Sequence, residues 1–248
     1  MIILKSQILS DFPDINFGFS TKIGLKRKGP FFFNMSMTVK DDKDIVNKNR
    51  NSFFNYFGLT YDNVVLQKQA HTDVITYVTS GGQIGESDAL ITDKPNIGLA
   101  ISSADCTPIF IFDNKNKLIA GVHSGWRGTE KKILLKTVNI LFKEFGSSPE
   151  NIFVYIGPSI SQKNYEVGPE VAELFNEKYT RQKGNKYLLD VNCANYDMII
   201  DSGIPENNIE NSKLCSFNMK NLLHSYRRDG IQSGRALGLI VMTAPNAI

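Results

Sequence analysis

Short apolar runs near the middle of the chain constrain its fold more than any other feature. Residues 97–102, 109–112 and 118–123 are largely apolar, and Pro, Asp, Asn and Gly separate them. Apolar runs of this length between turn-forming residues are typical of buried strands, whereas helices need longer periodic segments. Residues 152–156 and 237–242 share this character, so the sequence predicts buried strands distributed along the chain.

The segments between these runs include helical patterns. Residues 41–57 begin with two aspartates, carry apolar side chains at helical spacing and precede a glycine, which suits a helix end. A second helix is expected over residues 129–145, and shorter ones over 169–179 and 192–200. Strands and helices are mixed without the regular alternation of a doubly wound sheet. We therefore predict a mixed α/β (α+β) fold, with layered mixed sheets flanked by helices.

Composition and charge exclude several classes of protein. The chain contains no repeat, low-complexity tract or linker, so we expect residues 1–248 to form a single domain. A hydrophobic content of 42% is sufficient for a core that needs no disulfide support. The net charge of +3 is too small, and the basic residues are too scattered, to predict a nucleic-acid partner.

Cysteine usage and hydropathy together predict a cytoplasmic location. Cys106, Cys193 and Cys215 are the only cysteines, and an odd, sparse set indicates a reducing compartment rather than a disulfide framework. Residues 1–14 are apolar too briefly to form a signal peptide. No stretch reaches the roughly 18 apolar residues that a membrane span needs, so no membrane partner is expected.

The residues best suited to chemistry are His71, Cys106 and His123. Each is expected at the end of a strand or in the turn that follows it, where sites are commonly built. Two histidines and a cysteine suit a zinc ion with an open fourth position, where a bound water becomes acidic. No pair has the short spacing of a metal motif, so the pattern alone leaves another reading open. In that reading the histidines stabilise turns and Cys106 is a small buried apolar residue.

A second chemical hypothesis uses the same side chains. Cys106 is then a nucleophile that His71 or His123 activates, and Asp88 or Asp105 orients the histidine. The sequence does not give the geometry that separates this hypothesis from metal binding.

The other candidate residues are assigned by their neighbours. Cys193 and Cys215 lie among apolar residues and are expected to be structural, and His224 is expected at the surface or in a loop, where it could line a pocket. Arg127 is the best candidate for an anion site, because it is predicted to lie in the turn before a helix N-terminus. The further basic candidates are Lys22, Arg50, Arg227 and Arg228.

Five motifs occur in a fixed order along the chain. They are LQKQAHTD, SDALITDKPNIGLAISSADCTPIFIFD, IAGVHSGWRGTEKKIL, YIGPSISQKNYEVGPEV and SYRRDGIQSGR. The set resembles the laccase-domain or polyphenol oxidase family, also called the YfiH type, from about Phe17 to Met242. The resemblance implies a layered α/β fold and places the family's metal ligands on His71, Cys106 and His123. In the segment FSTKIG, Lys22 stands where the resemblance leads us to expect arginine.

The resemblance also implies a function in purine nucleoside metabolism. Its expected reactions are phosphorolysis of adenosine, inosine and methylthioadenosine to the free base and ribose 1-phosphate, and zinc-assisted deamination of adenosine. Arg127, Arg50 and Lys22 are the expected phosphate-binding residues, with copper as the alternative metal and a homo-oligomer left open.

Three alternatives to this function stay open. One is a cytoplasmic factor that edits peptidoglycan precursors, or a Cys-dependent hydrolase. A copper-dependent polyphenol oxidase is another, although three histidines are too few for a multicopper enzyme. The last is a zinc-stabilised interaction domain, for which Asp88, Asp105 and Cys215 are candidate fourth ligands.

Overall fold

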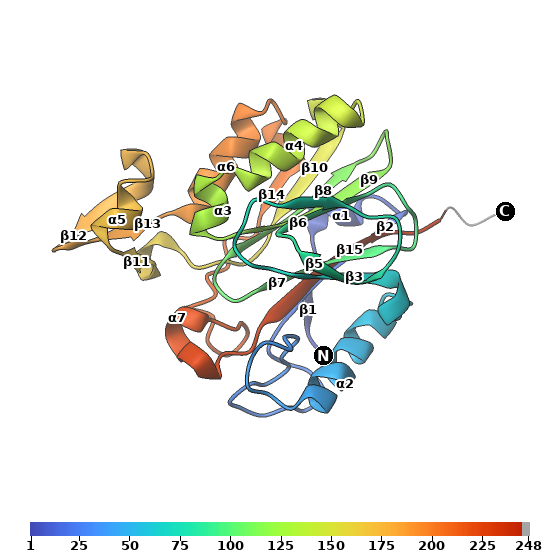
Figure 1. Ribbon diagram of the computed structural model, residues 1–248, viewed down its shortest axis with the longest axis horizontal. Coiled ribbons are helices and arrows are strands. Elements are labelled where there is room, and N and C mark those ends of the chain that lie inside the picture. Colours follow the sequence, from blue (N-terminus) through green and yellow to red (C-terminus); the bar gives the residue numbers. More distant parts are fainter. Residues whose placement is uncertain (245–248) are drawn as a thin grey trace.

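Two six-stranded mixed sheets pack face to face, and helices cover both outer faces (Figure 1). The computed structural model describes residues 1–244, and this arrangement confirms the predicted mixed α/β fold with layered sheets. The strand order of the first sheet is β1 (Ile3–Leu4), β2 (Ile15–Ser20), β15 (Ala236–Met242), β7 (Gly98–Ser103), β3 (Val64–Lys68) and β5 (Gly82–Glu86). The order of the second is β14 (Ile209–Asn211), β10 (Ile152–Ile156), β8 (Thr107–Asp113), β9 (Leu118–Ser124), β6 (Ala89–Thr92) and β4 (Ile75–Tyr77).

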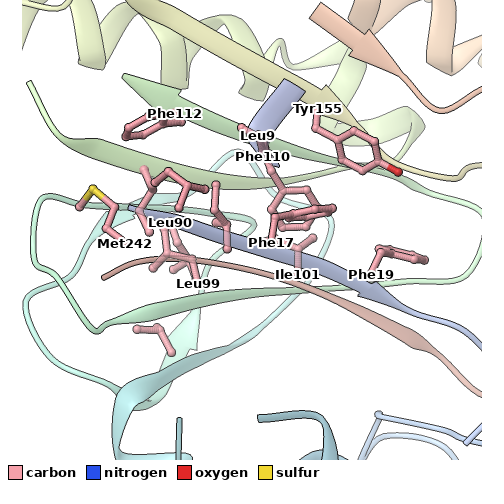
Figure 2. Close-up of a cluster of buried hydrophobic side chains, with 14 of the residues drawn as sticks. Leu9, Phe17, Phe19, Leu90, Leu99, Ile101, Phe110, Phe112, Tyr155 and Met242 are labelled. Carbon is pink, nitrogen blue, oxygen red and sulfur yellow. The ribbon is translucent and has the colours of Figure 1, made fainter. Parts of the chain in front are cut away.

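The main core lies between the two sheets. Alternate residues of one strand serve different layers: Phe110 and Phe112 of β8 point into the space between the sheets, where Phe110 packs against Phe17 (Figure 2). Ile109 and Ile111 of the same strand point to the helices outside. A strand buried on both faces needs apolar residues at successive positions, which is why the sequence shows continuous apolar runs instead of alternation.

Helices pack on the outer face of each sheet. The first sheet is covered by α2 (Lys43–Asn55), whose Phe53 and Phe54 are completely buried against it. Asp42 caps this helix, because its carboxylate accepts the backbone N–H groups of Asp44 and Ile45. The second sheet is covered by α4 (Ile133–Glu144) and α6 (Val191–Asp201). The short helices are α1 (Gln7–Ser10), α3 (Trp126–Glu130), α5 (Pro169–Ala172) and α7 (Tyr226–Asp229).

Two of the predicted helices differ from the structure. The segment expected as one helix from Thr129 is divided into α3 and α4, because Lys132 has a left-handed backbone with φ of 59°. The helix expected over residues 169–179 is wrong for most of its length, since α5 ends at Ala172. Asn176 has an extended backbone and its side chain caps a separate 3-10 helix at Glu177–Tyr179. The predictions for α2, α6 and the five buried strands are confirmed within a few residues.

A small three-stranded sheet projects from the side of the sandwich, at the left of Figure 1. It consists of β11 (Glu166–Val167), β13 (Lys186–Leu189) and β12 (Thr180–Lys183). Its own apolar cluster includes Val167 and Leu189, and Trp126 and Tyr165 pack against it. This small sheet therefore reaches back to the turn that follows His123. Among residues 1–244, no helix is both long enough and apolar enough to cross a membrane.

Candidate metal centre

The pairing of β8 with β9 brings Cys106 and His123 together. The strands are antiparallel, with Thr107 opposite Ser124 and Pro108 opposite His123. Cys106 directly precedes β8, so it lies beside the end of β9. His71 arrives from the loop that follows β3. One nitrogen or sulfur atom from each of these three residues lies within 4.8 Å of the other two, and Cys106 Sγ is 3.8 Å from His71 Nε2.

Asp88 contacts His123 and the backbone on either side of His71. Its carboxylate is completely buried, and Oδ1 lies 2.7 Å from His123 Nδ1. Its other oxygen, Oδ2, accepts the backbone N–H groups of Ala70 and Thr72 at 3.2 and 2.7 Å. These two residues flank His71, whose φ of 59° is unusual for a residue with a side chain. A single carboxylate therefore fixes the backbone at His71 and orients the ring of His123.

The electrostatics of the pair favour its charged form. Burial alone would raise the pKa of Asp88, but hydrogen bonds from His123 and Thr72 outweigh it and lower the pKa to about 2. Burial opposes the charge on His123, yet the nearby Cys106 and Asp88 raise its pKa to about 9. Because Nδ1 of His123 faces Asp88, its Nε2 is left for the centre. A histidine whose far nitrogen contacts a carboxylate is a common arrangement around bound metals.

Cys106 has thiolate character in this surrounding. Burial would raise the pKa of its thiol, but the positive charge and hydrogen bonds of His123 and His71 lower it to about 6. Only the thiolate is a metal ligand or a nucleophile, so this environment suits both hypotheses.

A glycine leaves room for the donors. A Cβ atom added at Gly125 would lie 2.8 Å from Cys106 Sγ and 3.3 Å from His71 Cδ2. Two hydrogen bonds fix the turn that carries Gly125. Thr129 Oγ1 donates to the carbonyl of Gly125, and Asn195 Nδ2 donates to Thr129 Oγ1. All atoms of this support are buried. The backbone can therefore approach the sulfur closely without losing its position.

The donor set fits a zinc or a single copper ion. Two imidazoles and a thiolate are ligands for either metal. Zinc bonds of roughly 2.0 to 2.3 Å place tetrahedral ligands about 3.5 Å apart, so a modest closure of the three side chains is sufficient. His123 is buried, Cys106 half-buried and His71 exposed, which leaves one side of the cluster open. Within residues 1–244, Asp88, Asp105 and Cys215 do not belong to the group of donors, so the structure supplies three ligands there and not four.

The three predicted phosphate-binding residues lie in different surroundings. Arg127 is exposed, and it belongs to the first turn of α3 instead of the turn before a helix, with its guanidinium 4.2 Å from the Trp126 ring centre. Arg50 is half-buried on α2, and its Nε donates to the carbonyl of Met35 at 2.6 Å. Lys22 is buried, and its Nζ donates to the carbonyl of Lys220 at 3.1 Å.

Two residues near the centre carried no signal in the sequence, although both lie inside the motifs. The pKa of the Tyr165 phenol is raised, first by burial and then by the charge on Cys106. Burial lowers the pKa of Arg235, and the charges of Asp105 and Cys106 oppose this effect. A third residue, Arg227, was one of the basic candidates, and its guanidinium lies 5.0 Å from the Tyr165 ring centre. Only tertiary packing brings these groups toward Cys106.

His224 lies in a loop just before α7, which is one of the two expected positions, but it is not at the surface. Its side chain is only 2% exposed, because it packs inside the molecule beside Gly234, and burial lowers its pKa to about 3. It does line a small cavity, together with Asp105 and Ser216. Cys193 and Cys215 line a separate cavity of about 240 Å³.

Two imidazoles and one thiolate at the edge of an α/β sandwich define a candidate centre for one metal ion. Residues 16–243 match the family described as multi-copper polyphenol oxidoreductase laccase, and the chain belongs to this family.

The chain is similar to known proteins over nearly its whole length. It is 31% identical over 258 residues to a purine nucleoside phosphorylase of Bacteroides thetaiotaomicron, an alignment that covers 96% of both chains. It is also 31% identical to the purine nucleoside phosphorylase YlmD of Bacillus subtilis, over 91% of this chain and 87% of that one. The crystal structure of YlmD from Geobacillus stearothermophilus superposes with a TM-score of 0.90 at 28% identity, over 96% of this chain and 94% of that one.

Proposed function

We propose that this protein is a purine nucleoside phosphorylase whose reaction takes place beside Cys106, His71 and His123. The observation that carries the proposal is the similarity to proteins named purine nucleoside phosphorylase, which extends over 96% of the chain in one case. The convergence of three donor atoms within 4.8 Å supports the position of the site. The proposed substrates are adenosine, inosine and methylthioadenosine, together with phosphate.

In the proposed reaction a phosphate oxygen forms a bond to C1′ of the ribose. The bond between C1′ and the base nitrogen breaks, and its electron pair leaves with the base, which takes up a proton. The products are the free base and ribose 1-phosphate, or its methylthio analogue. The phenol of Tyr165 is protonated near pH 7 and suits hydrogen bonding to the leaving base. Burial and the charge on Cys106 raise its pKa, so it is better suited to hydrogen bonding than to giving up its proton.

Phosphate needs positive charge near the centre. Arg127 is the best placed of the predicted residues, since it is exposed and its charge is close enough to act on Tyr165. Arg227 is close enough for its charge to act on Tyr165, and Arg235 is close enough to interact with the charge of Cys106. Arg50 and Lys22 are proposed as secondary contacts, because their own hydrogen bonds to Met35 and Lys220 already occupy part of their donors.

We also propose that His71, Cys106 and His123 hold zinc and that adenosine is deaminated at the same place. Zinc held by these three residues would supply an acidified water molecule, which hydrolytic deamination requires. Asp88 contacts Nδ1 of His123 and so leaves Nε2 free to act as a ligand, and Gly125 leaves the space that Cys106 needs. The open side of the cluster is where a purine-sized substrate has access.

One observation favours a second function. Cys106 Sγ lies 3.8 Å from His71 Nε2, and its lowered pKa of about 6 gives it the properties of a nucleophile. A Cys-dependent hydrolase, including one that edits peptidoglycan precursors, is therefore the alternative. A polyphenol oxidase with a single copper on the same ligands is less favoured, because only one group of donors exists within residues 1–244.

Product analysis tests these proposals directly. Protein purified without added metal is assayed for zinc and copper, then incubated with each nucleoside in the presence and absence of phosphate. Free base that appears only with phosphate supports phosphorolysis, and inosine formed from adenosine without phosphate supports deamination. Absence of turnover on all three nucleosides, by protein with a full complement of metal, would show that the substrate class is wrong.

A further inference from the structure

We propose that Asp105 is a positioning residue for Cys106, and that it sets the direction of the Cys106 sulfur through hydrogen bonds from distant segments. The inference rests on the metal centre of the proposed function. It assigns separate tasks to two carboxylates: Asp88 positions the histidines, and Asp105 positions the cysteine.

The backbone at Asp105 is strained. Its φ is 96°, in a region that residues with a side chain rarely adopt. Such a conformation persists only where the surroundings impose it. Cys106 is the next residue, so the direction of its Cα–Cβ bond follows from the peptide plane that Asp105 holds.

Three distant segments impose this conformation. Asp105 Oδ1 accepts the hydroxyl of Ser216 at 2.6 Å, and Oδ2 accepts the backbone N–H of Arg227 at 2.7 Å. The carbonyl of Asp105 accepts the backbone N–H of Ile160 at 2.9 Å. The side chain is only 9% exposed, so solvent does little to replace these bonds. Both carboxylate oxygens thus hold Asp105, and through it Cys106, against the body of the protein.

These anchors do not include a histidine. In the described structure the carboxylate that contacts His123 is that of Asp88, which answers the question of which aspartate orients the imidazole. Asp105 instead joins the cysteine turn to α7, whose Arg227 guanidinium lies over the Tyr165 ring. The direction of the Cys106 sulfur is therefore coupled to the position of Arg227 and, through it, to Tyr165.

A second aspartate on the same strand supplies a matched control. Asp113 ends β8 at the opposite end from Cys106, and it is completely buried. Its Oδ1 accepts the backbone N–H groups of Lys115 and Asn116 at 2.9 and 3.0 Å. Asp113 holds a turn that has no metal donor. Asp113→Ala and Asp105→Ala therefore both remove a buried acceptor, but only Asp105→Ala changes the position of a ligand.

Two substitutions at Asp105 separate geometry from charge. Asparagine accepts the Arg227 N–H with its oxygen and donates its amide to the Ser216 hydroxyl, which can act as an acceptor, and it tolerates positive φ. We expect Asp105→Asn to bind zinc close to the wild-type affinity. Asp105→Ala removes both acceptors while the strain remains, and we expect it to bind zinc about 10- to 100-fold more weakly.

The experiment uses the full chain and two readouts that do not depend on activity. Zinc affinity is measured by competition with a chromophoric chelator, and cobalt(II) is added to report the thiolate-to-metal absorption band of Cys106. We expect Asp105→Ala to weaken both signals and Asp113→Ala to lower only the unfolding temperature. Asp105→Asn is expected to restore the cobalt band.

Either of two results at Asp105 would overturn the proposal. One is a folded Asp105→Ala protein with the wild-type zinc affinity and cobalt band. The other is an Asp105→Asn protein that loses as much as Asp105→Ala, which would assign the effect to charge. If Asp105→Ala does not fold, Ser216→Ala removes one anchor and is expected to weaken zinc binding several-fold, and an unchanged affinity there also contradicts the proposal. Absence of nucleoside turnover in the wild-type protein, with zinc bound, would count against the proposed function and would leave the role of Asp105 untouched.

Discussion

β8 and β9 form one antiparallel pair whose two ends have different characters. At one end Asp113 pairs with Leu118 across a short turn, and Asp113 satisfies two backbone N–H groups of that turn. At the other end Thr107 pairs with Ser124, and the chain continues into Cys106 on one strand and Gly125 on the other. The strands between the ends are completely buried. The same pair therefore ends in a structural turn on one side and in a candidate metal centre on the other.

Backbone strain alone does not distinguish these ends. Lys117 at the structural turn has φ of 54°, and Asp105 at the other end has φ of 96°. The two ends differ in whether metal-donor side chains come together there. Lys117 is exposed, whereas Asp105 is buried and next to a cysteine that meets two histidines. Strain combined with burial and shifted pKa values indicates a functional site, and strain in an exposed turn does not.

The largest effect is expected from Cys106→Ala. Loss of the thiolate leaves two imidazoles, so zinc affinity should fall at least about 100-fold, and nucleoside turnover should be lost. Metal analysis after dialysis and product analysis measure the two losses.

Cys193→Ala and Cys215→Ala are the controls for this change. Cys215 Sγ accepts hydrogen bonds from Ser161 and Asn164 and does not belong to the donor group, so both variants should keep metal and turnover. Loss of metal from a folded Cys215→Ala protein would show that the ligands are misassigned. An inactive Cys106→Ala protein that retains its metal would favour the nucleophile hypothesis.

Asp88→Asn should have the next largest effect. One of the two side-chain atoms must become an NH2 group, which cannot accept from the N–H groups of Thr72 and Ala70 or from His123. We expect zinc affinity to fall about 10- to 100-fold, as a competition titration can measure.

Asp88 also gives a pH signature. The folded pKa of about 2 lies below the ordinary value, so the stability that Asp88 contributes is present above about pH 4 and is lost as the pH falls toward 2. Urea unfolding at a series of pH values should show this loss in the wild type and less of it in Asp88→Asn. Identical acid dependence in both proteins would contradict the role assigned to this carboxylate.

Gly125→Ala tests the closeness of the backbone to the sulfur. The new methyl group would lie 2.8 Å from Cys106 Sγ, so the sulfur or the turn must move. We expect zinc affinity to fall about tenfold while the protein remains folded. Gly85→Ala is the control, because no atom lies within 4 Å of a Cβ built there. Equal zinc affinity in both variants would mean that the sulfur has free space after all.

Much of the fold could be predicted because burial imposes a pattern on the sequence. Strands covered on both faces are apolar at nearly every position away from their ends, and this pattern predicted β8, β9, β10 and β15 within about a residue or two. The division of α3 from α4 and the early end of α5 could not be predicted. They depend on a left-handed backbone at Lys132 and on the side-chain cap from Asn176, and neither residue type requires those conformations.

The candidate centre was predictable for a different reason. Three residues of two scarce types, histidine and cysteine, were expected at strand ends and gave a weak signal, and the ordered motifs made it specific. The supporting residues were beyond reach, because their roles follow from contacts between segments far apart in the sequence. Asp105 meets Arg227 across 122 residues, and His224 is buried by packing that its polar neighbours Ser225, Tyr226 and Arg227 do not indicate.

The smallest effect is expected from Arg127→Ala. Arg127 follows His123 by a few residues and is exposed, with its guanidinium over the Trp126 ring, so its replacement should leave the metal centre and the fold intact. A charged hydrogen bond to phosphate is worth enough to raise the KM for phosphate about tenfold when it is removed. Adenosine deamination uses no phosphate and should be unchanged. Equal losses in the two reactions would instead mean that Arg127 only steadies the turn through its contact with Trp126.

Arg181, which is exposed on β12 of the small sheet, provides the control for this change. Arg181→Ala also removes one positive charge, and it should alter neither rate. A selective rise in the KM for phosphate, at constant metal content, would place the anion at the same end of β9 as the metal ligands and extend the contrast between the two ends of the strand pair.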